Sequence, residues 1–344
     1  MSTLIERLGI SIPLIQSPMA GGLSTPALVA AVANAGGLGS IGAAYMSSAQ
    51  LEQEVAEIRK RTAGPFAINL FAGGEQPADP LRAALVTPAL KAFRRELGIS
   101  EEPPAPAPRA HDDRFERVLK LQPRAFSFTF GIPPPEQLRA LRAQSILIIG
   151  TATNLPEAQA LEEAQVDAIC AQGAEAGGHR GTFIGPIEDG LVPIAELVPL
   201  LVRGVHTPII AAGGFMDGQA ISRALSWGAA AVQLGTAFLN CAEAGTPPAY
   251  RNALTAGPGR ETVITRAYSG RYARAIRNRF TDAFAQKEVA PYPQQQQLTQ
   301  EIRSAATRQS RADLMQMLVG EGAPRVRAIP AAELIAILLR EMRD

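Results

Sequence analysis

The chain has 344 residues, with 33 Lys and Arg against 32 Asp and Glu, so its formal net charge is only +1. A nearly neutral field offers no general attraction for nucleic acid or anionic lipid, and we expect neither as a partner. The start, MSTLIERLGI, does not have the pattern of a signal peptide, and no apolar run reaches the roughly 18–20 residues of a membrane span. With two cysteines in apolar runs, and three histidines in unrelated contexts that give no metal-ligand spacing, we expect a cytoplasmic protein without a metal site.

Short apolar runs alternate with segments of helical period, which is typical of a parallel α/β sheet. We expect eight strands, at residues 14–19, 37–42, 66–71, 125–130, 146–151, 168–173, 208–214 and 231–238. Helical segments are expected at 25–36, 47–61, 135–143, 155–164, 194–204 and 217–228. Eight such units predict a (β/α)₈ TIM barrel, because a doubly wound sheet more often has five or six strands.

The alternation predicts three parts of the chain. Residues 1–256 are expected to form the barrel, with an insertion at about 74–122 that contains the proline-rich run EEPPAPAPRA (101–110). Residues 257–324 are rich in Arg and Gln, have no strand pattern, and are predicted to form a smaller helical second domain on the substrate side. The amphipathic segment within 325–344 is predicted to pack back on the barrel as a C-terminal helix.

Glycine-rich turns follow the last two predicted strands, and they consist of Gly213, Gly214, Gln233, Leu234, Gly235 and Thr236. In a TIM barrel these two loops commonly bind a phosphate. Glycine lets backbone N–H groups approach the anion, and the next helix N-terminus adds a partial positive charge. We therefore predict a phosphate site there, with simple tight turns as the alternative.

A competing glycine pattern, GLGSIG (37–42), has the GxGxxG form of a dinucleotide fingerprint, with acidic residues between 52 and 57 downstream. That fingerprint requires a strand before it, whereas the preceding segment, 25–36, reads as a helix. We therefore interpret GLGSIG as a strand and do not expect a Rossmann-type site.

The stretch AQGAEAGGHRG, residues 171–181, follows the sixth predicted strand and contains four glycines. We predict that Gly177 and Gly178 lie against a planar ligand while His179 projects over the open end of the barrel. A flexible loop with a solvated histidine is the alternative. Three other strand ends carry residues that can border the same ligand, two of them amides that can hydrogen-bond a heterocycle: Met19, Asn69 and Gln172.

The remaining histidines and a group of arginines are expected to be structural. His111, beside two aspartates, is predicted at the surface, and His206 at the end of the barrel away from the chemistry. Five arginines could face an anionic substrate, but helical spacing favours a solvated helix face with salt bridges; they are Arg266, Arg271, Arg274, Arg277 and Arg279.

Six runs together resemble the nitronate monooxygenase family, long called 2-nitropropane dioxygenases: QSPMAGG (16–22), NAGGLGSIGAAY (34–45), FAINLF (66–71), QGAEAGGHRGTF (172–183), IIAAGGF (209–215) and AVQLGTAFL (231–239). The resemblance implies an FMN-dependent barrel enzyme that oxidises alkyl nitronates with O₂ to a carbonyl compound and nitrite. It also implies that His179 is the active-site histidine and that Met19 lies close to the flavin ring. The implied FMN contacts are Asn69, Gln172, Gly177, Gly214 and residues 233–236.

One segment departs from the family pattern. LMQMLVGEG (314–322) stands where a Trp and a Gln are expected in a WAGQG-like run, so the substrate wall is expected to differ. The alternative function is an NADH-dependent reductase of the same fold, acting on a quinone or enoyl thioester. A homodimeric assembly also stays open. The nitronate function is favoured for two reasons. Few aromatic residues near His179 could hold a nicotinamide, and the nearest in sequence is Phe183. Arg180 or a protonated His179 can also attract an anion.

Overall fold

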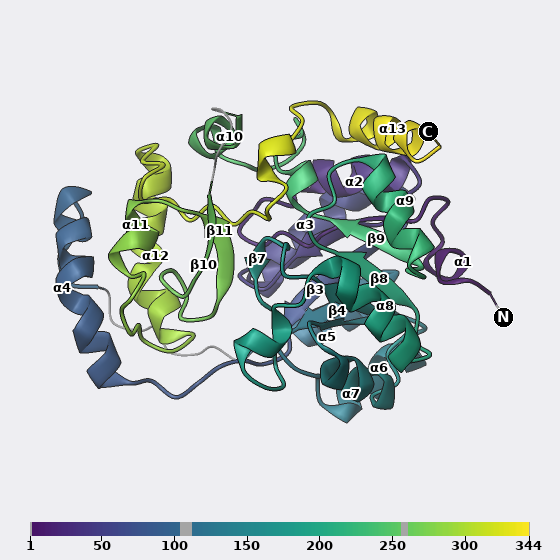
Figure 1. Cartoon of the computed structure of the whole chain (residues 1–344), viewed down its shortest axis with the longest axis horizontal. Helices are drawn as coiled ribbons and strands as arrows, with labels where there is room; N and C mark the ends of the chain where they lie inside the picture. Colours follow the sequence, from purple (N-terminus) through teal and green to yellow (C-terminus); the bar gives the residue numbers. More distant parts are fainter. Residues whose placement is uncertain (1, 104–111, 256–260, 344) are drawn as a thin grey trace.

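The computed structural model describes residues 2–103, 112–255 and 261–343. Eight parallel strands form one sheet: β1 (Leu14–Gln16), β2 (Gly39–Gly42), β3 (Phe66–Phe71), β4 (Ala125–Thr129), β5 (Leu147–Ala152), β6 (Ala168–Gln172), β8 (Ile209–Ala212) and β9 (Ala231–Leu234). Their order is β1-β9-β8-β6-β5-β4-β3-β2. A bridge between Ile15 and Leu38 closes the sheet, and the predicted TIM barrel is confirmed (Figure 1).

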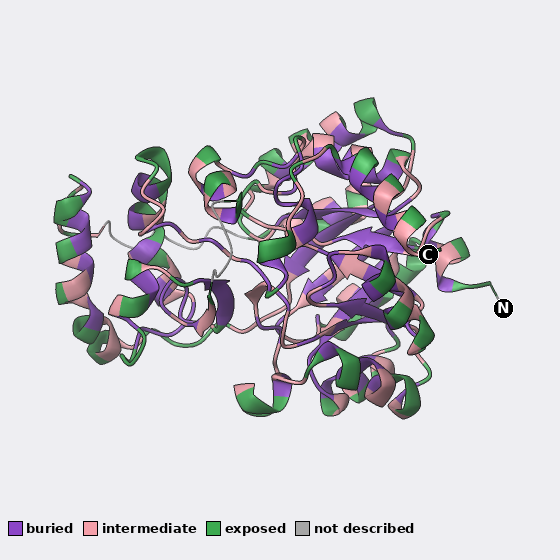
Figure 2. Cartoon of the chain, turned by 45° about the horizontal axis from the view of Figure 1, so that its top comes forward, coloured by how far each residue is buried: buried purple, intermediate pink, exposed green. Residues whose placement is uncertain are grey.

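The predicted helices cover the outside of this barrel: α2 (Pro26–Asn34), α3 (Ser48–Arg61), α6 (Pro135–Ala143), α7 (Leu155–Glu163), α8 (Ile194–Gly204) and α9 (Gly218–Ser226). Several starts are encoded locally, because a side chain accepts a hydrogen bond from the backbone N–H three residues on; these caps are Thr25, Ser47, Asn154 and Asp217. Figure 2 shows buried strands inside and helices that are exposed on their outer side.

Small side chains fill the amino end of the barrel. Alanines at strand starts, including Ala67, Ala125 and Ala231, form one apolar cluster with Leu4 and Leu8 of α1 (Leu4–Leu8). This buried apolar cluster closes the amino end of the barrel, and in TIM barrels the site lies at the carboxyl ends of the strands.

The segment after residue 261 is not purely helical, which corrects the expectation that it has no strands. Strands β10 (Thr262–Thr265) and β11 (Ala273–Ile276) pair antiparallel, and β11 also pairs with the two-residue β7 (Gly178–His179). Strands of four residues are too short for their alternation to stand out. The spacing of the arginines suggested a solvated helix face here, whereas Arg274 lies on β11 and is buried.

A second apolar cluster lies outside the barrel. It includes residues from α4 (Pro80–Glu96), α10 (Pro248–Thr255), α11 (Arg279–Ala283) and α12 (Gln294–Arg308), together with the β10–β11 hairpin and residues 314–323. The rings of Phe93 on α4 and Phe280 on α11 are 5.2 Å apart between centroids, so part of the predicted insertion packs with the later segment. We call this assembly the cap, and we propose that it is the second domain.

Some predictions fall outside the described residues: the domain boundary at 256, most of the proline-rich run 101–110, and His111. The other helix of the insertion, α5 (Arg114–Leu121), packs on α3 of the barrel. His206 is exposed just before β8, at the end of the barrel opposite the strand carboxyl ends, as expected.

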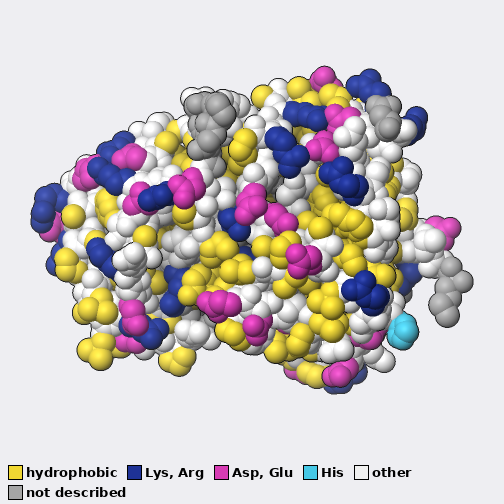
Figure 3. Space-filling model, in the orientation of Figure 1, with side chains coloured by type: hydrophobic (Ala, Val, Ile, Leu, Met, Phe, Trp, Pro, Cys, Tyr) yellow, Lys and Arg dark blue, Asp and Glu magenta, His cyan; other side chains and the backbone are white. Residues whose placement is uncertain are grey.

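The C-terminal helix α13 (Ala331–Glu341) packs against α2 and α9 on the outside of the barrel. Its Glu341 carboxylate accepts a hydrogen bond of 2.9 Å from the backbone N–H of Gly218 at the start of α9. Among the described helices, none combines the length and apolar character that crossing a bilayer requires. Basic and acidic side chains are interspersed on the face in Figure 3, in keeping with the small net charge.

Candidate active site

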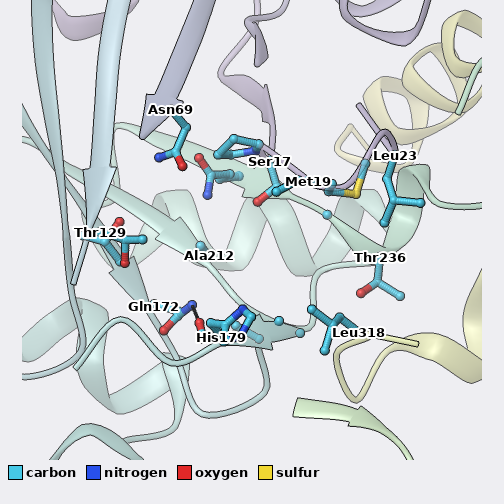
Figure 4. A pocket seen from close by; sticks show the side chains of 18 of the residues that line it. Ser17, Met19, Leu23, Asn69, Thr129, Gln172, His179, Ala212, Thr236 and Leu318 are labelled. Carbon is cyan, nitrogen blue, oxygen red and sulfur yellow. Dashed lines mark hydrogen bonds between the residues drawn. The ribbon is translucent and has the colours of Figure 1, made fainter. Parts of the chain in front are cut away.

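A cavity of about 270 Å³ opens at the carboxyl ends of the barrel strands, beneath the cap. Figure 4 shows His179 across this cavity from Asn69 and Met19. The structure brings together every residue predicted for the site, since the lining includes Met19, Asn69, Gln172, Gly177, Gly178, His179, Gly213, Gly214, Gln233, Leu234, Gly235 and Thr236.

Backbone N–H groups without partners lie at the ends of β8 and β9. Those of Gly213, Gly214, Gly235 and Thr236 donate no backbone hydrogen bond within the described residues. Gly214 has a φ of +72°, a left-handed conformation that a side chain would strain. Free donors on a backbone without bulky side chains can bind a phosphate.

The helix contribution that we expected at this place is smaller. Helix α9 begins only at Gly218, where Asp217 caps it, and β9 is followed by a three-residue 3₁₀ turn, η2 (Thr236–Phe238). The capacity to bind an anion therefore depends on the free N–H groups, because a helix dipole acts mainly within its first turn.

The amides of the barrel wall are used in different ways. Gln172 donates a hydrogen bond of 2.9 Å to the carbonyl of His179 and accepts one of 2.8 Å from the N–H of Gly181, so it holds the glycine-rich segment in place. Asn69 donates to the Ser127 hydroxyl at 2.9 Å, which leaves its carbonyl oxygen as an acceptor for a ligand.

Gly177 and Gly178 serve different purposes. A Cβ on Gly177 would lie 2.3 Å from the backbone nitrogen of Gly320, so this position is glycine because the cap backbone passes against it. A Cβ on Gly178 would meet nothing within 4 Å, although its φ of +82° favours glycine. We predicted that a ligand lies against both residues, but only Gly178 has free space beside it.

His179 is a half-buried imidazole set between aromatic rings, with Phe130 edge-on at 5.9 Å between ring centroids. Burial lowers the pKa of His179 to about 3, and the positive charges of Arg271 and Arg303 act in the same direction. The ring is therefore neutral at pH 7. The expectation that a protonated His179 attracts an anion is wrong.

Ser269, in the turn between β10 and β11, holds the ring of His179. The imidazole Nε2 and the Ser269 hydroxyl oxygen are 2.8 Å apart. The same hydroxyl accepts from the N–H of Arg271 at 3.2 Å and donates to its carbonyl at 3.3 Å. All three contacts are satisfied when Nε2 carries the proton, which leaves the lone pair on Nδ1.

Arg180 was expected to attract an anion, but it is 1% exposed and faces away from this cavity. Its guanidinium donates to the carbonyls of Gly173, Gln172 and Gly190 at 2.7–2.9 Å. The cation that lines the cavity is Arg303 on α12. Sequence reasoning missed it because nothing local distinguishes it from the other arginines of that helix.

Arg303 is held by the cap. It donates to the Gln316 side chain at 2.9 Å, to the carbonyl of Gln296 at 3.0 Å and to the Thr299 hydroxyl at 3.1 Å. Burial lowers its pKa from the ordinary value, yet an arginine stays charged at pH 7. It therefore places a fixed positive charge at the cavity.

The aromatic lining was also missed. Tyr45, Phe71 and Phe130 line the cavity, whereas Phe183, the residue expected there, does not. Phe71 and Phe130 end predicted strands and Tyr45 lies just after one, but aromatic side chains at strand ends are too common to identify a site. The cavity therefore has apolar ring surfaces, although the sequence suggested few aromatic residues near His179.

The departure from the family pattern lies at the cavity wall. Leu318 lines the cavity where a Trp was expected, and Glu321 pairs with Arg274 at 3.0 Å where a Gln was expected. Between them, the N–H of Gly320 donates to the Thr236 hydroxyl at 2.9 Å and joins the cap to the end of β9.

A closed α/β barrel with a cavity at its strand ends, free N–H groups and a neutral histidine defines an enzyme of the TIM-barrel class. A family model described as nitronate monooxygenase matches residues 1–341. The chain is 38% identical over 346 residues to a probable nitronate monooxygenase from Staphylococcus aureus (strain Newman), covering 99% of this chain and 97% of that protein. The chain belongs to the nitronate monooxygenase family, a family of oxidoreductases.

The chain is also similar to solved structures. A nitroalkane oxidase from Streptomyces ansochromogenes has a TM-score of 0.92 and 36% identity, covering 98% of each chain. FabK from Thermotoga maritima has a TM-score of 0.77 and 27% identity, covering 100% of this chain and 96% of that one.

Proposed function

We propose that the protein binds one FMN without a covalent bond and uses it to oxidise alkyl nitronates with O₂ to a carbonyl compound and nitrite. The observation that carries the proposal is the division of the cavity: free backbone donors at one end, and a neutral His179 with the fixed charge of Arg303 at the other. Membership of the nitronate monooxygenase family supports the substrate class.

The residues present fit a flavin mononucleotide. The N–H groups of Gly213, Gly214, Gly235 and Thr236 would hold its phosphate, and the carbonyl of Asn69 would accept from a ring N–H. The open backbone at Gly178 would lie against the ring. When bound, flavin would supply the redox chemistry that links oxidation of the substrate to reduction of O₂.

The protein's own side chains bind the substrate and handle its proton. The guanidinium of Arg303 would attract the negative nitro oxygens of a nitronate, which needs no further activation. A neutral nitroalkane must first lose its α-proton, and the lone pair on Nδ1 of His179 would take it. Phe71 and Phe130 exclude water around that histidine.

Two measurements test the proposal. Mass spectrometry of the released cofactor should find FMN at one per chain, whereas FAD or a protein that takes up no flavin would contradict the phosphate site. Anaerobic stopped-flow mixing of the flavin-loaded protein with an alkyl nitronate should change the flavin absorbance within seconds.

The second candidate is an NADH-dependent reductase of a quinone or an enoyl thioester. It gains support from the ring surfaces of Tyr45, Phe71 and Phe130, because a nicotinamide can stack on them. The same stopped-flow experiment with NADH separates the two functions. Rapid reduction by NADH with an inert nitronate would favour the reductase.

A further inference from the structure

A second cavity, of about 360 Å³, is lined by four arginines: Arg82, Arg180, Arg266 and Arg271. Three segments meet there: the start of α4, the loop that follows β7, and the turn between β10 and β11. No Asp or Glu is among the described residues that line it. The cavity is therefore a concentrated positive site in a protein whose net charge is close to zero.

Most of this positive charge has no acidic partner within the described residues. Arg82 pairs with Asp79 at 3.4 Å and with Glu288 at 3.0 Å. The other three arginines form no salt bridge there, and Arg180 and Arg271 donate to backbone carbonyls. A carbonyl satisfies a hydrogen bond but does not neutralise a charge, so these three arginines have no directly paired carboxylate in the described part of the chain.

Nearby carboxylates act on these arginines from a distance without pairing with them: the charge of Glu157 raises the pKa of Arg180 and of Arg271, and that of Glu175 raises the pKa of Arg180. The Glu157 carboxylate accepts from the N–H of Ile184 at 3.0 Å and from the Thr153 hydroxyl at 2.8 Å, so it is committed to the loop backbone. Asp189 lies beside Gly185 at the rim and forms no salt bridge in the described part of the chain. Burial lowers the pKa of Arg180 to about 10, and the neighbouring charge of Arg274 acts in the same direction.

Donors remain available for a ligand. Arg266 uses Nε for the carbonyl of Gly270 at 2.9 Å, while its two Nη groups have no hydrogen-bond partner among the described residues. The Nε of Arg180 has no hydrogen-bond partner either, but it is buried, so Arg180 adds charge to this site rather than an accessible donor. Tyr272, which is 38% exposed, has its ring over the guanidinium of Arg266 at 5.5 Å and adds an aromatic surface at the rim.

We propose that this arginine-lined cavity binds a phosphate-bearing anion of the pyrophosphate class. Four guanidinium groups, three of them without a salt bridge in the described residues, match a group with several negative charges better than one carboxylate, and guanidinium groups bind phosphate oxygens through paired N–H donors. The volume of about 360 Å³ is far above the roughly 10–15 Å³ that one water requires, so the cavity has room for a group of several atoms.

The site adjoins the active-site cavity without sharing its ligand groups. Arg271 lines the arginine cavity, and its guanidinium lies 3.9 Å from the ring centroid of Phe130, which lines the other one. Two residues before Arg271 in the chain, Ser269 contacts His179. The inference does not rest on the nitronate activity, and its test measures binding alone.

Isothermal titration of sodium pyrophosphate, and separately of ADP, into FMN-loaded protein at low salt tests the site. Bound FMN keeps the probes away from the N–H groups at the ends of β8 and β9, and free FMN is removed by gel filtration so that it does not compete for the arginine cavity. We expect binding that weakens with added NaCl and falls about tenfold or more in both Arg266→Gln and Arg82→Gln, which alter different segments of the lining. Arg277→Gln, an exposed arginine paired with Glu261 and Asp282, is the matched control and should bind like the parent.

The outcomes are separable. Tighter binding of ADP identifies a diphosphate on an organic molecule, tighter binding of pyrophosphate identifies the free anion, and either result with the expected variant pattern supports the site. Absence of binding at millimolar probe would overturn it. Equal binding by parent, Arg266→Gln and Arg82→Gln would do so too.

Discussion

The barrel side and the cap side of the active-site cavity are built from different materials. The barrel side presents strand ends, with backbone N–H groups at Gly214 and Gly235 and the amide of Asn69. The cap side presents Arg303 and Leu318 from a helix and an irregular segment. The barrel side is therefore suited to hold a flat cofactor in a fixed position, whereas the cap side is suited to bind and select the substrate.

The loop that carries His179 lies between these two sides. Gln172 of the barrel holds its backbone, and Ser269 of the cap holds its ring. Substitutions on the barrel side should therefore change flavin content, and substitutions on the cap side should change the kinetic constants of the loaded enzyme.

The largest expected effect is that of His179→Asn. Turnover of neutral nitroalkane should fall by about 10² to 10⁴, because the base for the α-proton is lost while the flavin contacts remain. Steady-state kinetics with nitroalkane and with preformed nitronate, together with the flavin-to-protein absorbance ratio, measure this. Parent-like turnover of nitroalkane would show that His179 is not the base.

Gly177→Val should lower flavin content and thermal stability together. Its side chain would overlap the backbone of Val319 and Gly320, which cannot move without opening the cap. Flavin absorbance and thermal unfolding report both effects. Gly98→Ala is the control, since a Cβ there meets nothing within 4 Å and only its φ of +66° is unfavourable. A Gly177→Val protein with full flavin and an unchanged Tm would mean that the cap does not close against this loop.

Arg303→Gln should raise KM for nitronate by about tenfold or more and leave KM for neutral nitroalkane nearly unchanged, because only the anion loses a charged partner. Arg308→Gln removes an exposed arginine from the same helix and should keep both KM values. If both substrates lost affinity equally in Arg303→Gln, the effect would come from packing of the cap and the charge argument would fail.

Ser269→Ala should reduce kcat for nitroalkane by roughly two- to tenfold with flavin content intact, because one neutral hydrogen bond orients the imidazole. Nitrogen NMR of labelled histidine distinguishes this effect from a general structural one. The parent should have the proton of His179 on Nε2, and the variant should show a mixture of tautomers. An unchanged spectrum would exclude Ser269 as the positioning residue.

The smallest effect concerns pH and stability. The folded protein keeps His179 neutral down to a pKa of about 3, whereas the unfolded chain takes up a proton below about 6.5. Folding is therefore progressively disfavoured as the pH falls from 6.5 towards 3, and no such penalty exists above 6.5. Denaturant unfolding should show a steeper loss of stability with falling pH in the parent than in His179→Asn. Parallel curves would indicate that the ring is not desolvated.

The sequence by itself determined the barrel and the residues at its strand ends. Apolar alternation and capping residues such as Ser47 and Asp217 are local signals, and the carboxyl ends of parallel strands necessarily meet at one end of a barrel. Asn69, Gln172 and Gly235 could therefore be grouped into one site although they lie far apart in the chain. Their roles toward FMN stay a prediction.

Only the tertiary structure decided the cap and the charges around it. Whether an arginine points into a cavity depends on the direction of its side chain and on partners distant in sequence, which no local pattern contains. Arg180 points away from the active site and donates to backbone carbonyls, whereas Arg303 of α12 lines that site. Arg274 lies in a strand where the sequence predicted a helix. The ionisation of His179 likewise followed from burial and from two arginines of the cap and its hairpin, because solvation is set by everything that surrounds a group in space.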